Sequence, residues 1–136
     1  MSEAEGAREV FSREIQCFLG WSRRNVFPPH PNIHTDHDFA RERGFEGAIM
    51  SASQVVPHLH EALVELLGEE TFFGGTRVRY KMVRPVPAEG AARISIRVKA
   101  SNPRELELWV ENGPASAAIV GSALLAEDFE IPGTEQ

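Results

Sequence analysis

A strict alternation of apolar and charged residues runs through the second half of the chain, and it restricts the fold more than any other feature. Apolar residues occupy every second position in three runs, and a fourth run is less regular. The predicted strands cover 76–86, 92–100, 105–110 and 117–129. A period of two places one face of each strand on a core and the other in water, as in antiparallel sheets. Turn-forming residues separate the runs, at 87–90, 101–103 and 112–114.

A long apolar helix is predicted immediately before these strands, over Ser51–Leu67. One broad apolar stripe follows it at helical spacing, formed by Val55, Val56, Leu59, Ala62, Leu63, Leu66 and Leu67. Pro57 is tolerated near the helix start if Ser53 is the cap, and Gly68 ends the helix. A helix with so broad an apolar stripe must pack against another apolar surface, which the predicted strands supply. We therefore predict one α+β domain over residues 1–136, a long central helix wrapped by an antiparallel sheet.

The N-terminal part of the chain is expected to be less regular. Residues 1–10 are small and charged, which predicts a flexible start. Ser12 is a suitable N-cap for a short helix, because Ile15, Phe18 and Leu19 follow at helical spacing. Three prolines then interrupt the stretch from Gly20 to Pro31, so we expect an irregular surface loop there.

A second short helix is predicted between this loop and the long helix. Thr35 precedes Asp38 by three residues, as in a capping box, and Gly44 is a suitable end. Phe39 and Ala40 would then form the buried side of the helix. The pattern thus places two short helices ahead of the long one.

Composition narrows the class of protein. The chain has 136 residues, of which 42% are hydrophobic and 25% charged, as in ordinary globular domains. No apolar run approaches the ~20 residues that a membrane helix needs, and the start lacks the features of a secretory signal. Cys17 is the single cysteine, which favours a reducing compartment. The formal net charge of −6 argues against a nucleic-acid partner. We expect a cytoplasmic protein that handles a small molecule.

The most distinctive residues lie between 32 and 49. They are Asn32-Ile33-His34-Thr35-Asp36, Phe39-Ala40 and Gly44-Phe45-Glu46-Gly47-Ala48-Ile49, followed later by Arg79-Tyr80-Lys81, Pro85-Val86 and Gly121-Ser122-Ala123. From about Phe11 to Leu125 the chain resembles the MaoC-like hot-dog family of dehydratases and (R)-specific enoyl-thioester hydratases. The resemblance implies a sheet wrapped around a long helix and dimers with sites between helix and sheet. It also implies hydration of 2-enoyl thioesters or dehydration of 3-hydroxyacyl thioesters.

The sequence departs from the family pattern at two places that carry the chemistry. The family's catalytic stretch is Asp-x-Asn-Pro-x-His, whereas this chain has Pro29-His30-Pro31-Asn32-Ile33-His34. The histidine is present, but Pro29 holds the place of the aspartate. At the start of the long helix the family commonly has His-Gly, where a backbone N–H helps to hold the thioester carbonyl. Here the residues are Ser51-Ala52, so the family's standard activity does not follow automatically from the fold.

His34 is the residue that we expect to be catalytic, because imidazole gives and takes protons near neutral pH. We expect its side chain to face a cavity and to contribute little to stability. The resemblance implies substrate binding by Asn32, Ser51 and Ala52. Either Asp36 or Asp38 could orient a water molecule, and Asp36 and His30 are the auxiliary candidates. An acid at a helix start also stabilises free N–H groups, and for Asp36 this structural role is favoured.

A metal site is a competing hypothesis for the histidines. His30, His34 and His37 are separated by four and three residues, but zinc requires three or four ligands in fixed geometry and no cysteine lies nearby. We predict no metal and no cofactor. Arg77, Arg79, Lys81 and Arg84 form a basic strand face that suits coenzyme A phosphates or an acidic carrier protein, or is simply solvated.

Three functions remain open at this stage. The first is an acyl-thioester enzyme of the hydratase or dehydratase type, acting on a coenzyme A or carrier-protein thioester through His34, or a divergent cyclase or isomerase. The second is a non-catalytic hot-dog partner subunit or acyl-binding protein. The third is a hot-dog thioesterase, although no carboxylate base is evident. We also expect a homodimer or a heteromer with another hot-dog subunit, because an edge strand and Trp109 would otherwise be exposed. No nucleic-acid or membrane partner is expected.

Overall fold

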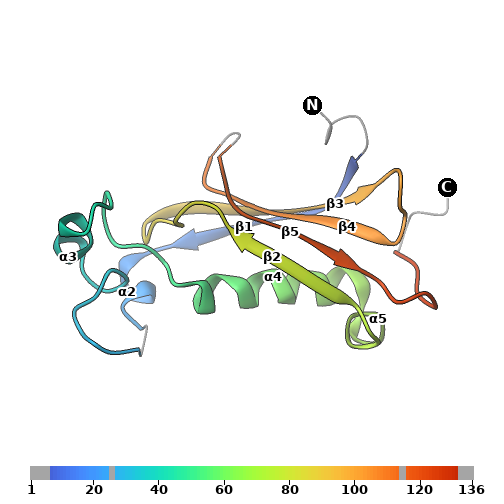
Figure 1. The fold of residues 1–136 in the computed structure, drawn as a ribbon, viewed down its shortest axis with the longest axis horizontal. Helices are drawn as coiled ribbons and strands as arrows, with labels where there is room; N and C mark the ends of the chain where they lie inside the picture. Colours follow the sequence, from blue (N-terminus) through green and yellow to red (C-terminus); the bar gives the residue numbers. More distant parts are fainter. Residues whose placement is uncertain (1–6, 25–26, 114–115, 132–136) are drawn as a thin grey trace.

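The computed structural model describes residues 7–24, 27–113 and 116–131. Its elements are β1 (Ala7–Cys17), α2 (Leu19–Ser22), α3 (His37–Glu42), α4 (Ala52–Leu67), α5 (Glu69–Phe73), β2 (Arg77–Met82), β3 (Gly90–Lys99), β4 (Glu105–Glu111) and β5 (Ala117–Leu124). The sheet lies over α4, with α2 and α3 at one end of the molecule and α5 at the other (Figure 1). Among the described residues, no helix has the length and apolar character needed to cross a membrane.

The five strands form one sheet in the order β1-β3-β4-β5-β2, and every neighbouring pair is antiparallel. Side chains at alternate positions of the central strands face α4 and are fully or almost fully buried. They are Ile94, Ile96 and Val98 on β3 and Leu106, Leu108 and Val110 on β4. The alternation therefore buries one face of the sheet against the helix, which confirms the predicted α+β architecture.

The first strand is the main error of the sequence-based prediction. The short helix predicted from Ser12 does not form, and residues 7–17 are the edge strand β1, which pairs with β3 along its length. Residues 7–10 belong to this strand, so the flexible start was wrong for them, while residues 1–6 lie outside the described part of the chain. The pattern misled because Arg13 takes an inward position between Phe11 and Ile15. Its guanidinium is not stranded in the core, since it reaches Glu61 and Glu65 on α4.

Helix α4 agrees closely with its prediction, except at its cap. The N-cap is Ser51 rather than Ser53, and Gln54 Oε1 accepts from the Ser51 backbone N–H at 3.4 Å in a capping box. Gln54 Nε2 also donates to Trp21 O at 2.9 Å, which ties the helix start to α2. Gly68 ends the helix with a φ of 87°, a conformation that favours glycine. The buried side chains are Val55, Val56, Leu59, Ala62, Leu63 and Leu67.

The chain after β2 leaves the sheet earlier than predicted. Strand β2 ends at Met82, where Val83 N and Arg84 N both donate to Ala118 O on β5 and break the regular ladder. Pro85 and Pro87 then lack the N–H groups that would extend it. This segment instead bonds to the residues that precede α4. Met50 N donates to Val86 O at 2.7 Å, and Ala88 N donates to Ala48 O at 2.9 Å. These two hydrogen bonds therefore fix the segment that leads into α4, next to which the candidate site lies.

Candidate functional site

The turn that carries His34 is held by its own polar groups. Asn32 Oδ1 accepts from the His34 backbone N–H at 2.8 Å, and Thr35 Oγ1 accepts from the Asn32 N–H at 2.9 Å. The Asn32 amide also donates to Phe27 O and Pro29 O, at 3.1 and 2.9 Å. Asn32 was predicted to bind substrate, but its side chain is engaged with the backbone on both sides. In this geometry it shapes the turn that presents His34.

The His34 side chain makes one hydrogen bond that determines its chemistry. Its Nδ1 lies 2.7 Å from Ile49 O. A carbonyl oxygen can only accept, so Nδ1 carries the proton and neutral His34 keeps a lone pair on Nε2. Among the described residues, nothing forms a hydrogen bond with that Nε2. The imidazole is thus oriented through one nitrogen and available for proton transfer through the other.

The same hydrogen bond corrects one expectation. His34 was expected to contribute little to the fold, yet its half-buried ring joins the turn to the segment before α4. A neighbouring bond from Ile49 N to Ile33 O, at 2.9 Å, makes this connection double. Removing the imidazole therefore takes the closer of two hydrogen-bond donors from the Ile49 carbonyl, which costs about 1 kcal/mol.

Ser22 is a site residue that sequence reasoning missed. It is fully buried, donates from Oγ to His34 O at 2.5 Å, and lies 3.4 Å from Ile49 O. Segments around 22, 34 and 49 therefore meet at one point, although they are far apart in the sequence. A lone serine at the end of a short helix carries no pattern that reveals such a contact.

The first residues of α4 stand next to this junction in the chain. Ser51 is buried, and its Oγ lies 3.1 Å from Gln54 Oε1 and 2.9 Å from Ser53 Oγ. Ala52 opens the helix, and its backbone N–H has no hydrogen-bond partner in the described parts of the chain. A free N–H at a helix start attracts an oxygen with negative charge. Ser51 shapes the helix start, and Ala52 offers the donor.

The acidic and basic neighbours of His34 are engaged elsewhere or stand apart. Asp36 caps α3 by accepting from Phe39 N at 2.8 Å, so its structural role is the one observed. Asp38 pairs with Arg41 at 3.1 Å. Within the described residues, neither aspartate nor His30 forms a hydrogen bond or ion pair with the His34 side chain. Those residues also contain no group of three or more metal-ligating side chains.

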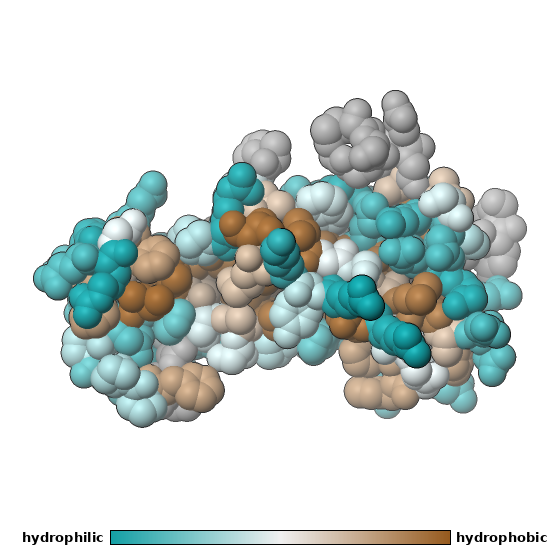
Figure 2. Space-filling model, viewed as in Figure 1, coloured by the Kyte–Doolittle hydropathy of each residue, from teal (hydrophilic) through white to brown (hydrophobic). Residues whose placement is uncertain are grey.

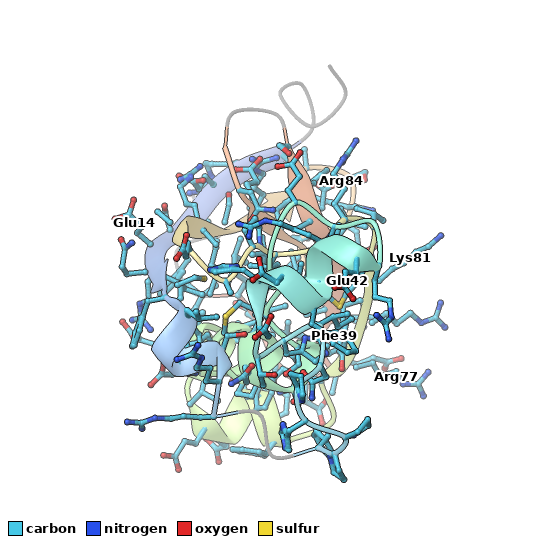
Figure 3. The ribbon with its side chains drawn as sticks, turned by 90° about the vertical axis from the view of Figure 1, so that its left-hand side faces the viewer. Glu14, Phe39, Glu42, Arg77, Lys81 and Arg84 are labelled. Carbon is cyan, nitrogen blue, oxygen red and sulfur yellow. The ribbon has the colours of Figure 1, made fainter. Side chains whose placement is uncertain are left out.

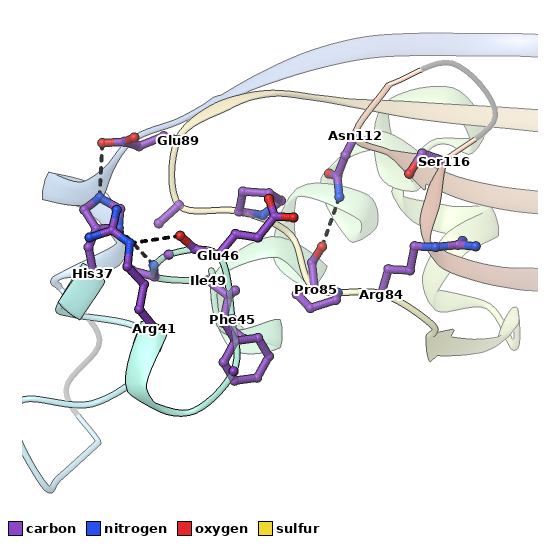
Figure 4. A pocket seen from close by; sticks show the side chains of 15 residues that line it. His37, Arg41, Phe45, Glu46, Ile49, Arg84, Pro85, Glu89, Asn112 and Ser116 are labelled. Carbon is purple, nitrogen blue, oxygen red and sulfur yellow. Dashed lines mark hydrogen bonds and ion pairs between the residues drawn. The ribbon is translucent and has the colours of Figure 1, made fainter. Parts of the chain in front are cut away.

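His37 belongs to a second cluster that the sequence did not reveal. Its Nδ1 accepts from Ala48 N–H at 2.9 Å, and its Nε2 lies 3.2 Å from Glu89 Oε2 (Figure 4). Both ring nitrogens are used, so neutral His37 has no free lone pair for base catalysis. A Cβ at Gly47 would lie 3.0 Å from His37 Nδ1, so this glycine makes room for the ring. Glu89 is distant in sequence, and no motif links it to His37.

This second cluster borders an open cavity of about 590 Å³. The cavity lies between α3, the segment 84–89 and the β4–β5 hairpin, and Arg41, Glu46 and Arg84 contribute to its wall (Figure 4). Ile49 lines it as well, whereas His34 does not. In the single chain, the candidate catalytic histidine therefore does not line this cavity and is linked to its wall through the Ile49 carbonyl.

Comparisons with known proteins establish the fold. No family model matches the chain, and no curated protein matches it. Among solved structures, the (R)-hydratase PhaJ1 from Pseudomonas aeruginosa aligns with a TM-score of 0.66 at 15% identity, over 88% of this chain and 79% of that one. The ChsH1–ChsH2 complex from Mycobacterium tuberculosis aligns with a TM-score of 0.66 at 11% identity, over 89% and 96%.

A MaoC-like dehydratase from Phytophthora capsici gives a TM-score of 0.68 at 14% identity. The alignment covers 89% of this chain but only 41% of that one. Identities this low establish structural similarity rather than shared chemistry. The chain has the hot-dog fold of MaoC-like dehydratases and (R)-hydratases, and the predicted resemblance is confirmed at that level.

Proposed function

We propose that the protein is an acyl-thioester enzyme of the hydratase or dehydratase type, with His34 as the acid–base group. The observation that carries this proposal is the bond from His34 Nδ1–H to Ile49 O, which leaves Nε2 free to move a proton. The thioester would belong to coenzyme A or to a carrier protein. Hot-dog relatives such as the (R)-hydratase PhaJ1 support the reaction class by analogy of fold.

In the dehydration direction, Nε2 of His34 removes the proton from the α-carbon of a 3-hydroxyacyl thioester. Negative charge then develops on the thioester oxygen, where the free N–H of Ala52 is available as a donor. The imidazolium returns the proton to the departing 3-hydroxyl, so a double bond and one water molecule form. Hydration is the reverse. One histidine performs both proton transfers, which compensates for the aspartate replaced by Pro29.

The absence of a carboxylate next to His34 favours a second candidate function. Among the described residues no acidic side chain forms a hydrogen bond or ion pair with the imidazole, and Ala52 carries a Cβ where the family commonly has glycine. These features suit a partner subunit that completes a heteromer or binds an acyl group without turning it over. A substrate that brings its own nucleophile, as in cyclisation, would also avoid the need for a positioned water.

Two substitutions at His34 distinguish catalysis from a purely structural role. His34→Ala should lower turnover of 3-hydroxyacyl or 2-enoyl thioesters by roughly 10²–10⁴-fold, the usual contribution of a positioned acid–base group. It should also lower the free energy of unfolding by about 1 kcal/mol, because Ile49 O loses the closer of its two donors. His34→Gln keeps an N–H donor, so it should recover part of the stability but none of the activity.

His58→Gln is the matched control, because His58 is another half-buried histidine and packs against Trp21 rather than lying in the turn. It should leave turnover unchanged. The assay follows enoyl-thioester absorbance over a panel of acyl chain lengths, and denaturant titration gives the stability. Full activity in His34→Ala would end the acid–base proposal. A wild-type chain that binds thioesters but converts none of them would favour the partner-subunit function.

A further inference from the structure

Helix α2 connects the start of α4 with the turn that carries His34. Trp21 O accepts from Gln54 Nε2 at 2.9 Å, which ties α2 to the N-terminus of α4. The following residue, Ser22, donates from Oγ to His34 O at 2.5 Å. Both α2 and α3 lie at the end of the molecule that faces the reader in Figure 3. A helix of four residues thus bonds to both parts of the candidate site.

The hydroxyl of Ser22 has no substitute among its neighbours. Hydrophilic and apolar side chains cover this end of the molecule (Figure 2), but Ser22 is fully buried, so bulk water does not reach its Oγ. Among the described residues, no other group donates to His34 O. A carbonyl in a protein interior needs a donor, because an unpaired one costs free energy. Loss of this hydroxyl would therefore leave the His34 carbonyl to move toward another donor.

The same hydroxyl also lies next to the group that orients the His34 ring. Ser22 Oγ is 3.4 Å from Ile49 O, the carbonyl that accepts from His34 Nδ1 at 2.7 Å. A hydroxyl has one hydrogen, and the nearer His34 O takes the larger share of it. In the described parts of the chain, Ser22 alone has a side chain that is hydrogen-bonded to both carbonyls. The direction of the ring depends on how these carbonyls are placed, because one belongs to the residue and the other holds its side chain.

We propose that Ser22 is a positioning residue for the reaction assigned to His34. Its hydroxyl holds the His34 and Ile49 carbonyls together and so fixes the direction in which Nε2 meets the substrate. A misplacement of about 1 Å can lower a rate about 10²-fold, so a small change in ring direction is enough to matter. Ser22 acts only through His34 and does not contact the substrate. The inference rests on the proposed function, because it concerns the rate of that reaction.

Substitution of Ser22 should affect turnover more than substrate binding. Ser22→Ala should lower kcat by about tenfold or more and change KM by less than about threefold, because the base is misdirected while the contacts to the thioester remain. Ser22→Thr restores a hydroxyl, so its kcat should lie above that of the alanine variant. Enoyl-thioester absorbance gives both constants for each variant and for wild type.

The tautomer of His34 gives a second readout that needs no turnover. Nitrogen-15 NMR distinguishes the protonated from the unprotonated ring nitrogen, and the His34 signals are those that disappear in His34→Gln. Wild type should show Nδ1–H alone, because Ile49 O accepts from it. In Ser22→Ala an Nε2–H population should appear, because the ring is no longer held on that carbonyl. If wild type converts no thioester, the proposed function fails, and the tautomer still decides whether Ser22 positions the ring.

Ser95→Ala is the matched control, because Ser95 is also fully buried and donates from Oγ at 2.5 Å, here to Glu9 on the face of the sheet away from α4. It should lower the melting temperature but change neither kcat nor the His34 tautomer. An unchanged tautomer in Ser22→Ala would overturn the proposal, as would a kcat within about twofold of wild type or an equal loss in Ser95→Ala. If Ser22→Ala fails to fold, as judged by its thermal unfolding curve, Ser22→Cys, which keeps a weaker donor, is measured under the same criteria.

Discussion

The Nδ1 atoms of His34 and His37 have opposite hydrogen-bonding roles, because their backbone neighbours differ. A carbonyl holds the first at Nδ1, so that Nδ1 must donate, whereas a backbone N–H holds the second at Nδ1, so that it must accept. Two histidines three residues apart thus become a ring with a free lone pair and a ring with none. The difference arises entirely from backbone groups, and for this reason composition and spacing single out His34 only through the family pattern.

The thiol of Cys17 is a residue whose surroundings suppress its reactivity. It is 3% exposed, and burial raises its pKa above the ordinary value. A raised pKa leaves less thiolate at any given pH, and the thiolate is the reactive form. We expect a thiol reagent at pH 8 to label the native protein more slowly than the denatured protein, by about tenfold or more. Equally rapid labelling of both would show that the end of β1 opens readily.

Gly121 determines whether the edge element β2 can join the sheet. A Cβ built at this position would lie 2.2 Å from Arg79 O and 2.9 Å from Tyr80 Cα, and neither backbone atom can move freely. Gly121→Ala should therefore push β2 away from β5 and lower the free energy of unfolding by about 1–3 kcal/mol. Denaturant titration measures the change.

Gly113→Ala is the control for that substitution, since no described residue beyond its chain neighbours lies within 4 Å of the added methyl group. Its effect should stay within about 0.5 kcal/mol. If both alanine variants were equally stable, β2 would have to tolerate the displacement, and its pairing with β5 would contribute little to the fold.

At the level of elements, apolar periodicity correctly predicted the helix and strands whose structure does not depend on one particular distant partner. Helix α4 and strands β3 and β4 carry unbroken apolar patterns, because each faces one continuous core. Strand β1 was missed since Arg13 occupies an inward position, and only the acids of α4 make that position acceptable. The end of β2 was misplaced for a related reason, as segment 84–89 pairs with residues before α4. Long-range partners decide such cases, and a single sequence does not display them.

The residues of the candidate site also divide into those that the sequence predicted and those that it did not. His34 was predicted from its motif, and the capping role favoured for Asp36 was observed. Ser22 and the Ile49 carbonyl were not predicted, because main-chain acceptors and isolated hydroxyls have no sequence signature. The catalytic role of His34 and the substrate-binding roles of Ser51 and Ala52 stay predictions.

On the scale of the whole molecule, the net charge of the chain and the local charge at β2 predict opposite effects on self-association. The chain has a formal net charge of −6, yet β2 at the edge of its sheet carries Arg77, Arg79 and Lys81, which form no ion pair with the described residues. Replacing Arg77, Arg79 and Lys81 by Gln makes the chain more negative overall but removes repulsion at the edge. If β2 governs association, this variant should self-associate more tightly than wild type at ~0.1 M salt, and added salt should narrow the difference. Weaker self-association of the variant in sedimentation experiments would show that overall charge dominates.

The hydrogen bond at the Ile49 carbonyl affects how the proposed site could select a bound molecule by its size. His34 stands on the carbonyl of Ile49, and Ala52 begins its helix three residues later in the same anchored segment. A displacement of this segment would act on both groups, on His34 through one hydrogen bond and on Ala52 through the chain, so their separation would change little. The proposed site would then select substrates by their dimensions. The carbon that loses a proton must reach His34 while the oxygen that gains charge reaches the Ala52 N–H.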